Sequence, residues 1–489
     1  MGDPTVTVGK PGTGGFNQTV KELVESLKDS SLNIVIITNK NKDRNKDFIS
    51  ISSNVTVYFI DFDTYWESHQ DLLVDNFDTI LKRVSNIIEL ISNKAKICLI
   101  HSFYWLSGII AVNLKRKFNI PFIHTVISLA ENKLSVGVSP HTSAQRRIED
   151  DFLPESELIF AITPQEKNIL VNTYRVDSKK IVIVGRSVSK EFFRAFNEKS
   201  CLQEYNREVE IILSSNDNSW WINGAFLYVG RITPTKGIEQ IVRAWVYANE
   251  RNGLDIPLWF IGGTPQQILK MREQIGANGL SLVKYEKSNK IIWWGNLSSV
   301  GISTLMRKAK ALIMHSQFEA GGRVIIEALT AGIPVIATPY GFGSDYIYDG
   351  YNGFVTEFND IIKLSNCMLR FSEQPYLSSV MGNCAHNFMN EIYLSWDYLN
   401  KHLQIYNAFL TDGSCLNIPS DLDIKPKNLN SFKARHSVLC FPFFNTERNT
   451  SELSEILSKE IGDNSITQMY DDNFHADIYS VQKGGSNMF

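Results

Sequence analysis

Short apolar runs alternating with amphipathic stretches constrain the fold of this chain more than any other feature. In the first two hundred residues the runs occupy 33–38, 55–60, 96–101, 121–127, 158–163 and 180–185. Segments between them, such as 16–29 and 77–92, repeat apolar residues at the i, i+3, i+4 and i+7 spacing of an amphipathic helix. Strands that are apolar throughout need helices on both faces of a parallel sheet. This half is therefore predicted to be a doubly wound α/β domain.

The same alternation begins again after a polar, irregular stretch. The new apolar runs are 225–230, 257–263, 290–295, 310–315 and 333–338, and they predict a second Rossmann-like domain. A long amphipathic stretch follows at 387–410. We expect a first domain at 1–196, a linker or insertion at 197–223, a second domain at 224–392, a C-terminal helix at 393–410 and an extension of unknown role at 411–489.

Composition excludes several classes of function. The 49 basic and 52 acidic residues give a net charge of −3, which provides no electrostatic footprint for nucleic-acid binding. No apolar run is long enough for a transmembrane segment, and the N-terminus lacks the pattern of a signal peptide. The six cysteines form no CxxC pair and are expected to be reduced thiols. A cytoplasmic protein is the expectation.

Two similar α/β domains in one chain predict a ligand cleft between the carboxyl ends of their strands. A first loop at this edge, 9–16, carries Gly14 and Gly15 just before a helix. There the backbone favours an anion or a sugar hydroxyl, although a tight turn without a ligand explains the pair equally well.

A second loop, within 227–238, carries Arg231 and Lys236 between a strand and a helix. A planar guanidinium and a compact ammonium five residues apart suit a diphosphate. Taken alone, the pair is more simply read as two solvated surface cations.

A third segment, 315–338, carries Glu319 after a strand and Glu327 inside the following helix. Gly321 and Gly322 allow the chain to run close to a ligand and open that helix. The carboxylates suit an acid and base pair of a glycosidase or acceptors for a sugar and a ribose. As isolated residues near a helix start they are also simple dipole partners.

In order and spacing these segments resemble the retaining GT-B glycosyltransferases, a family that includes sucrose-phosphate synthase, glycogen synthase and bacterial glycolipid mannosyltransferases. The resemblance covers about residues 5–410. It rests on 101–108, 146–170, 229–237, the Glu-x7-Glu signature and the helix with Trp396. It implies two Rossmann-like domains facing across a cleft, with a C-terminal helix crossing back to the first, acceptor-binding domain.

The resemblance also implies roles for single residues. Arg231 and Lys236 would neutralise the leaving diphosphate of a nucleotide-sugar, and Glu319 would hold hydroxyls of the transferred sugar. Glu327 would accept the ribose hydroxyls. The rest of the implied donor site consists of Gly14, Gly15, Gly295, Asn296, Leu297, Gly321, Gly322, Arg323 and Val324. The family retains anomeric configuration without a well-placed enzymatic nucleophile and needs no metal.

Two departures from the family pattern concern the donor. Ile127 stands where the family usually has a histidine near the 6-hydroxyl of the donor sugar, which fits a pentose or a 6-deoxy sugar. His124, on the other face of that strand, is more simply a core residue. At 185–189 the sequence GRSVS replaces a usual Pro-x-Gly-Val-Asp and adds Arg186. An Asp-x-Asp pattern begins at Asp61. This pattern is typical of the metal site of a different transferase fold, and two Rossmann-like domains do not fit that fold, so we do not assign a metal to it.

The resulting prediction is a retaining, metal-independent hexosyl- or pentosyltransferase that uses a nucleotide-sugar donor and no cofactor. Its acceptor, whether a sugar, a lipid-linked group or a small molecule, is not identified by the sequence. Two alternatives remain: a non-catalytic GT-B subunit that binds or stabilises a partner, and a glycoside phosphorylase or hydrolase.

Overall fold

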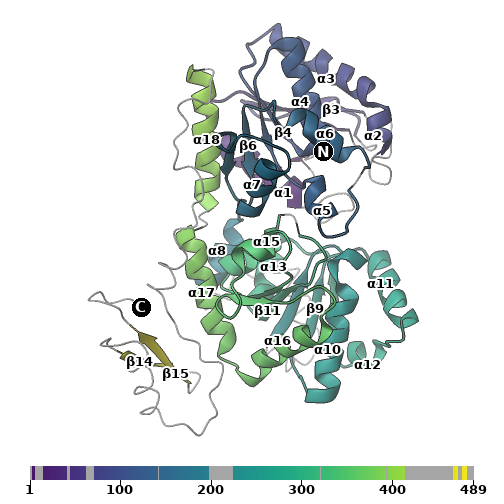
Figure 1. Ribbon diagram of the computed structural model, residues 1–489, viewed down its shortest axis with the longest axis vertical. Helices are drawn as coiled ribbons and strands as arrows, with labels where there is room; N and C mark the ends of the chain where they lie inside the picture. Colours follow the sequence, from purple (N-terminus) through teal and green to yellow (C-terminus); the bar gives the residue numbers. More distant parts are fainter. Residues whose placement is uncertain are drawn as a thin grey trace.

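The computed structural model describes residues 3–5, 15–40, 44–61, 71–140, 142–197, 224–319, 321–392, 395–412, 466–471 and 476–481. Apart from Asn197, which is the last residue of a helix, the predicted linker at 197–223 lies outside the described residues, as does most of the extension at 411–489. Figure 1 shows two α/β lobes, one above the other, with the N-terminal lobe at the top.

The N-terminal lobe is built on parallel strands, as the apolar runs predict. Four of them form a sheet in the order β4-β5-β6-β7. A separate three-stranded sheet has the order β1-β3-β2, in which β1 and β3 are parallel. The strands are β1 (Ile34–Asn39), β2 (Phe48–Ser52), β3 (Val55–Ile60), β4 (Ile100–Phe103), β5 (Phe122–Thr125), β6 (Leu158–Ala161) and β7 (Ile181–Ile183).

Strand β2 was not predicted, and it makes the first sheet mixed rather than wholly parallel. It pairs antiparallel with β3, and Phe48 at its start is 58% exposed. An edge strand with half-buried and exposed residues lacks the continuous apolar run by which the buried strands are recognised. The turn between the two strands is fixed by Asn54, whose side-chain amide donates to the carbonyls of Leu27, Ser30 and Leu32 at 2.9–3.1 Å.

Helices surround these strands on both sides. They are α1 (Gly15–Leu27), α2 (Asp71–Asp75), α3 (Phe77–Ser92), α4 (Tyr104–Phe118), α5 (Ala130–Leu134), α6 (Gln145–Phe152), α7 (Pro164–Asn172) and the 3₁₀ turn η1 (Ser178–Lys180). The next helix, α8 (Lys190–Asn197), packs against the C-terminal lobe, because its Phe192 belongs to the apolar cluster of that lobe. Helix α3 follows the predicted period, because Ile80, Val84 and Ile88 are the apolar residues that it buries.

The C-terminal lobe holds one parallel sheet in the order β10-β9-β8-β11-β12-β13. Its strands are β8 (Ala225–Val229), β9 (Leu258–Ile261), β10 (Ile291–Gly295), β11 (Ala309–Met314), β12 (Val335–Ala337) and β13 (Gly353–Val355). Strands β8 and β9 are buried along their whole length, which fits their uninterrupted apolar sequences. The order reverses at β8, so the carboxyl ends of β8 and β11 form the switch point at which such sheets bind ligands.

The helices of this lobe are η3 (Pro234–Lys236), α10 (Ile238–Asn252), α11 (Pro265–Ala277), α12 (Val283–Lys287), α13 (Ser299–Met306), α14 (Arg323–Thr330), α15 (Phe342–Tyr346), α16 (Ile361–Glu373) and α17 (Leu377–Ile392). A further pair of antiparallel strands, β14 (Ile466–Asp471) and β15 (Ala476–Val481), lies beyond them. None of the helices in the described part of the chain is long and apolar enough to cross a membrane.

Helix α18 (Ser395–Asp412) leaves the C-terminal lobe and runs alongside the N-terminal one (Figure 1), as the resemblance implied. Its residues Tyr398, Ile405 and Phe409 share an apolar cluster with Ile123 of β5 and Phe160 of β6. The Tyr406 hydroxyl is 2.6 Å from Nδ1 of His101 on β4. The fold is therefore a GT-B arrangement in which the last helix fastens the two lobes together.

Two glycines at the ends of α10 provide a test of the loop that precedes this helix. Gly237 and Gly253 have the same backbone conformation, φ 68° and ψ 25°. A Cβ at Gly237 would lie 2.0 Å from the His315 carbonyl oxygen, whereas nothing lies within 4 Å of one at Gly253. Gly253→Ala should cost about 1–2 kcal/mol of folding free energy from the left-handed conformation alone, and Gly237→Ala about 1–3 kcal/mol more from the clash.

Denaturant unfolding of both variants measures this difference. Equal losses in the two would mean that the Gly237 loop is free to move away from β11.

Candidate active site

The loop after β8 and the loop after β11 meet at the junction between the lobes. The Gln317 amide donates to the Thr235 carbonyl at 2.9 Å, which ties the two loops together. Lys236 forms a close ion pair with Glu319, and the two side chains are only 13% and 20% exposed. The structure thus brings together two residues that are 83 positions apart in the sequence.

Arg231 lies on the same loop but remains exposed. Its position is set by its backbone, because the buried Tyr228 hydroxyl donates to the Arg231 carbonyl at 2.7 Å. An exposed guanidinium next to a paired lysine is suited to a negatively charged group that arrives from solvent.

A neighbouring part of the predicted donor site lies at the end of β10. The Gly262 amide donates to the Gly295 carbonyl at 2.6 Å, and Gly295 has a φ of 69°. Asn296 is exposed and Leu297 is half-buried. These three residues lie at the same edge of the sheet as Arg231, because β10, β9 and β8 are parallel neighbours.

Helix α14 begins next to Glu319 and carries Glu327. Its N-cap is Gly322, whose φ of 47° is left-handed, so that a glycine suits this position. Val324 packs against the core of the C-terminal lobe. The carboxylate of Glu327 accepts a hydrogen bond from Nε of Arg323 at 2.8 Å and is 7% exposed. Burial raises the pKa of Glu327 to about 7, although the charge of Arg323 works in the opposite direction.

Arg323 reaches across to the N-terminal lobe. Its two terminal nitrogens donate to the two carboxylate oxygens of Glu22 on α1, at 2.6 and 3.1 Å. Burial opposes charge on Glu22, but the arginine more than offsets it and holds the pKa of Glu22 below its usual value. Nothing in the sequence pointed to Glu22, which lies on the polar face of a predicted helix.

Arg186, which the sequence singled out as a departure, fills the space beside Gly321. A Cβ at Gly321 would lie 2.3 Å from a terminal nitrogen of the Arg186 guanidinium. Nη1 of Arg186 is 3.4 Å from the Thr19 hydroxyl of α1. The small residue and the large cation are thus complementary across the junction.

The structure also reveals a buried lysine that sequence reasoning missed. Lys133 of α5 is only 7% exposed, and its ammonium has no hydrogen-bond partner among the described residues. Burial lowers the pKa of Lys133 to about 8, with Arg231 of the opposite lobe adding to the effect and Glu149 opposing it. Glu149 itself accepts from the Ala130 amide at 3.0 Å and from the Gln145 side chain at 2.6 Å.

The remaining predicted residues are placed as follows. His124 is buried and lies 2.9 Å from the Ser102 hydroxyl, as a core histidine should. Ile127 is half-buried just after β5, and Gly15 is the first residue of α1. Gly14 lies outside the described residues, as does the second aspartate of the Asp-x-Asp. Within the described part of the chain no group of three or more His, Cys, Asp or Glu side chains is arranged to hold a metal ion.

Two α/β lobes that meet at the carboxyl ends of their strands, with a last helix returning to the first lobe, define the GT-B class. The lysine–glutamate pair and the exposed Arg231 lie at their junction. Comparison with known families agrees: residues 14–186 match the glycosyl transferase 4-like domain, and residues 223–388 match Glycosyl transferases group 1. The chain belongs to this family of GT-B glycosyltransferases.

Three proteins to which the chain is similar share at most about a quarter of their residues with it. The chain is 24% identical to a D-inositol 3-phosphate glycosyltransferase of Frankia alni over 396 residues, covering 76% of this chain and 89% of the relative. Sucrose-phosphate synthase from Thermosynechococcus elongatus has a similar fold, with a TM-score of 0.68 at 21% identity over 84% of this chain and 97% of that one. A HepE structure from Anabaena, solved with UDP and glucose, has a TM-score of 0.58 at 12% identity over 82% and 98% of the two chains.

The unpartnered ammonium of Lys133 leads to a prediction about stability. Lys133→Met removes a charge whose burial is unfavourable, so at pH 7 it should raise the free energy of unfolding by about 1–3 kcal/mol. The gain should be full below pH 8 and should shrink as the pH rises towards 10.5, where the lysine of the unfolded chain also loses its proton.

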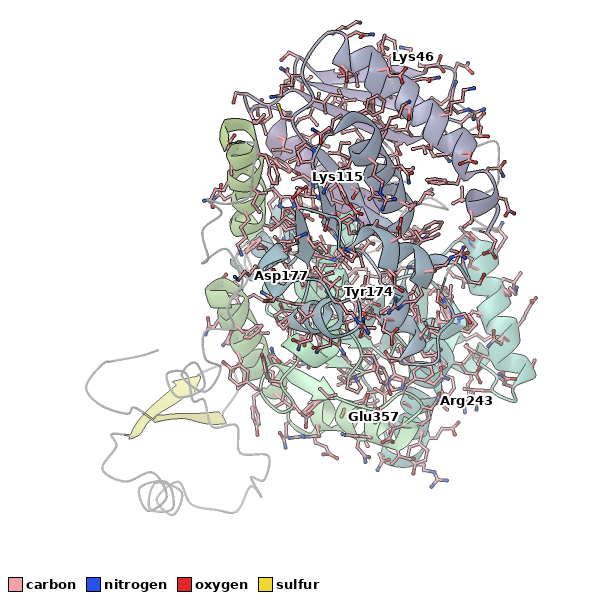
Figure 2. The ribbon with its side chains drawn as sticks, turned by 45° about the horizontal axis from the view of Figure 1, so that its top comes forward. Lys46, Lys115, Tyr174, Asp177, Arg243 and Glu357 are labelled. Atoms are coloured by element: carbon pink, nitrogen blue, oxygen red, sulfur yellow. The ribbon has the colours of Figure 1, made fainter. Side chains whose placement is uncertain are left out.

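Thermal and denaturant unfolding across this pH range measure the effect. Lys115→Met, at a residue labelled in Figure 2, is the matched control. The Lys115 ammonium donates to the Glu155 carbonyl and pairs with Glu157, both at 2.7 Å. A Lys133→Met protein less stable than wild type at pH 7 would contradict this account of the lysine.

Proposed function

We propose that this glycosyltransferase moves a sugar from a nucleotide-sugar donor to a hydroxyl of a phosphorylated small molecule, with retention of configuration and without a metal. The observation that carries the proposal is the Lys236–Glu319 pair beside Arg231, at the switch point of the C-terminal sheet. It combines cations for a diphosphate with a carboxylate for a sugar in one place.

In this proposal the leaving diphosphate is stabilised by protein cations. As the bond from the sugar to the diphosphate breaks, negative charge develops on the diphosphate oxygens, and Arg231 and Lys236 neutralise it. These two charges supply what a bound metal supplies in other transferases.

Retention is proposed to follow from attack on the same face that the diphosphate leaves. Glu319 is paired with Lys236, so it serves as a fixed acceptor for hydroxyls of the transferred sugar rather than as a free nucleophile. The acceptor hydroxyl then forms the new bond to the anomeric carbon, and its proton passes to the departing phosphate oxygen. Glu327 accepts the ribose hydroxyls of the nucleotide.

The acceptor class follows from Lys133. The buried ammonium of Lys133 has no hydrogen-bond partner among the described residues, and the charge of Arg231 helps to lower its pKa. Two positive charges near each other favour an anionic ligand at the junction. The names of two relatives, D-inositol 3-phosphate glycosyltransferase and sucrose-phosphate synthase, both include a phosphorylated small molecule. A phosphate on the acceptor would supply the charge that Lys133 lacks.

The donor sugar is proposed to lack a 6-hydroxyl, because the half-buried Ile127 provides no hydrogen-bonding group at the usual histidine position. Turnover of UDP-xylose compared with UDP-glucose, and of GDP-fucose compared with GDP-mannose, measures this preference. Faster turnover of the 6-hydroxyl donors would overturn it.

Removing either cation of the donor loop tests the role of these residues in transfer. Arg231→Ala and Lys236→Ala should each raise the barrier to transfer by about 2–4 kcal/mol, since each removes positive charge from the developing diphosphate. The measurement is kcat with the donor selected by thermal-shift binding of UDP, GDP, ADP and dTDP.

Lys284→Ala is the control, because Lys284 also pairs with a glutamate, Glu250 at 2.7 Å, but on the exposed surface of the C-terminal lobe. Losses below tenfold in both loop variants would remove them from this role. Absence of binding by all four nucleotides would instead favour a non-catalytic GT-B subunit or a glycoside phosphorylase or hydrolase.

The acceptor proposal is tested with a matched pair of compounds. Wild type should prefer D-inositol 3-phosphate to inositol, and Lys133→Met should raise the KM for the phosphorylated compound at least tenfold while leaving that for inositol unchanged. The measurement is initial rate against acceptor concentration. Equal effects on both compounds would show that Lys133 does not bind the phosphate.

A further inference from the structure

The two lobes are joined by a buried charged bridge that includes a residue of the donor site. Arg323 is the first residue of α14 and donates to Glu327 one turn later at 2.8 Å. The same guanidinium donates hydrogen bonds to both carboxylate oxygens of Glu22 on α1, at 2.6 and 3.1 Å. The side chains of Arg323, Glu22 and Glu327 are 10%, 16% and 7% exposed, so the whole bridge is shielded from water.

The bridge fixes the carboxylate of Glu327 in one place. A hydrogen bond from Nε of Arg323 holds one of its oxygens, while Glu22 of the other lobe holds the two terminal nitrogens of the guanidinium. Glu22 is held in turn by the Ser187 hydroxyl and by the Gln18 side chain, the latter at 2.8 Å. The orientation of a donor-domain carboxylate therefore depends on contacts with the acceptor domain.

Burial raises the pKa of Glu327, and the charges around this carboxylate modify that shift. Glu22 on α1 and Glu191 on α8 disfavour its negative charge, and Arg323 on its own helix favours it. Arg186, on the segment between β7 and α8, reaches the same part of the junction through Thr19. Arg323 is thus the charged group that keeps a deeply buried carboxylate available as an acceptor near neutral pH.

We propose that Arg323 is a positioning residue for donor binding: it holds Glu327 ready for the ribose hydroxyls and, through Glu22, makes that readiness depend on closure of the two lobes. This inference rests on the assignment of Glu327 to the ribose under the proposed function. It adds a residue that acts through Glu327 and an energetic link between donor binding and domain arrangement.

The test is the affinity for UDP and for GDP, each titrated by calorimetry from pH 5.5 to 8.5. A carboxylate accepts hydroxyl hydrogen bonds better than a neutral acid, so affinity should fall as the pH drops through the pKa of Glu327. The terminal phosphate of the nucleotide also titrates, but it does so equally for every variant and cancels in comparisons with wild type.

Removal of the two partners of the bridge should shift this midpoint in opposite directions. Arg323→Met removes the charge that favours ionised Glu327, so the midpoint should rise by about one pH unit and binding at pH 7 should weaken about tenfold or more. Glu22→Gln removes a repelling charge, so the midpoint should fall. At pH 8.5, where Glu327 is ionised in both proteins, Glu22→Gln should still bind severalfold more weakly than wild type because closure has lost its contact.

Two further variants distinguish positioning from general damage to the fold. Arg323→Lys keeps the charge and should keep the midpoint close to that of wild type. Arg243→Met removes another arginine paired with a glutamate one turn away, Glu239 at 2.8 Å, on the outer side of the C-terminal lobe (Figure 2). It should leave both the midpoint and the affinity unchanged.

Failure of the inference can be told apart from failure of the proposed function. If Glu327→Gln binds UDP and GDP as tightly as wild type, the ribose assignment is wrong. If Glu327→Gln binds weakly while Arg323→Met and Glu22→Gln shift the midpoint in the same direction or not at all, the ribose assignment stands and the positioning role of Arg323 is overturned. If Arg323→Met does not fold, Glu22→Gln and Arg323→Lys decide the question alone.

Discussion

Burial of the Arg323 guanidinium between Glu22 and Glu327 is the interaction on which the geometry of the site depends. Removing three charges from water is costly, and the cost is offset only while all the partners are present. Burial disfavours the charge of the Arg323 guanidinium, but the two carboxylates outweigh this effect. The pKa of Arg323 therefore lies above its ordinary value. The lobes therefore have a specific closed arrangement rather than a loose one, and α14 and its neighbouring loop are fixed relative to α1.

The cations at the junction are of two kinds. Arg323 and Lys236 are paired with glutamates and thereby fix the positions of those glutamates. Lys133 is buried without such a partner in the described part of the chain, and Arg231 is exposed to solvent. Arg323 organises the junction through its two glutamates, whereas Lys236 is both paired with Glu319 and proposed to neutralise the diphosphate. Lys133 and Arg231 are the other two cations proposed for anionic ligands. A binding site that carries unneutralised charge costs stability, as functional sites commonly do.

Features that depend on residues close together in the sequence could be predicted, whereas contacts between residues far apart in the sequence could not. The buried strands and the helices between them were predictable, because a strand with two covered faces has a continuous apolar sequence and a helix with one covered face has a 3.6-residue period. Strand β2 was missed because its half-exposed residues follow neither rule. Arg231, Lys236, Glu319 and Glu327 could be singled out because each follows a predicted strand or glycine pair, and their roles stay predictions. Glu22 and Lys133 were missed, since a charged residue on a helix is usually solvated and nothing in its local sequence says otherwise.

The sequence by itself determined that the chain forms two parallel α/β lobes and that cations, glutamates and glycines lie at the carboxyl ends of the strands. Both properties depend on residues near one another in the chain. The tertiary structure alone decided which charges meet: Arg323 and Glu22 are 301 positions apart, and their pairing exists only because the lobes close with α14 against α1. The same arrangement brings Lys133 within electrostatic range of Arg231. Partner choice among charges depends on distance and burial in three dimensions, and neither quantity is encoded in any local stretch of sequence.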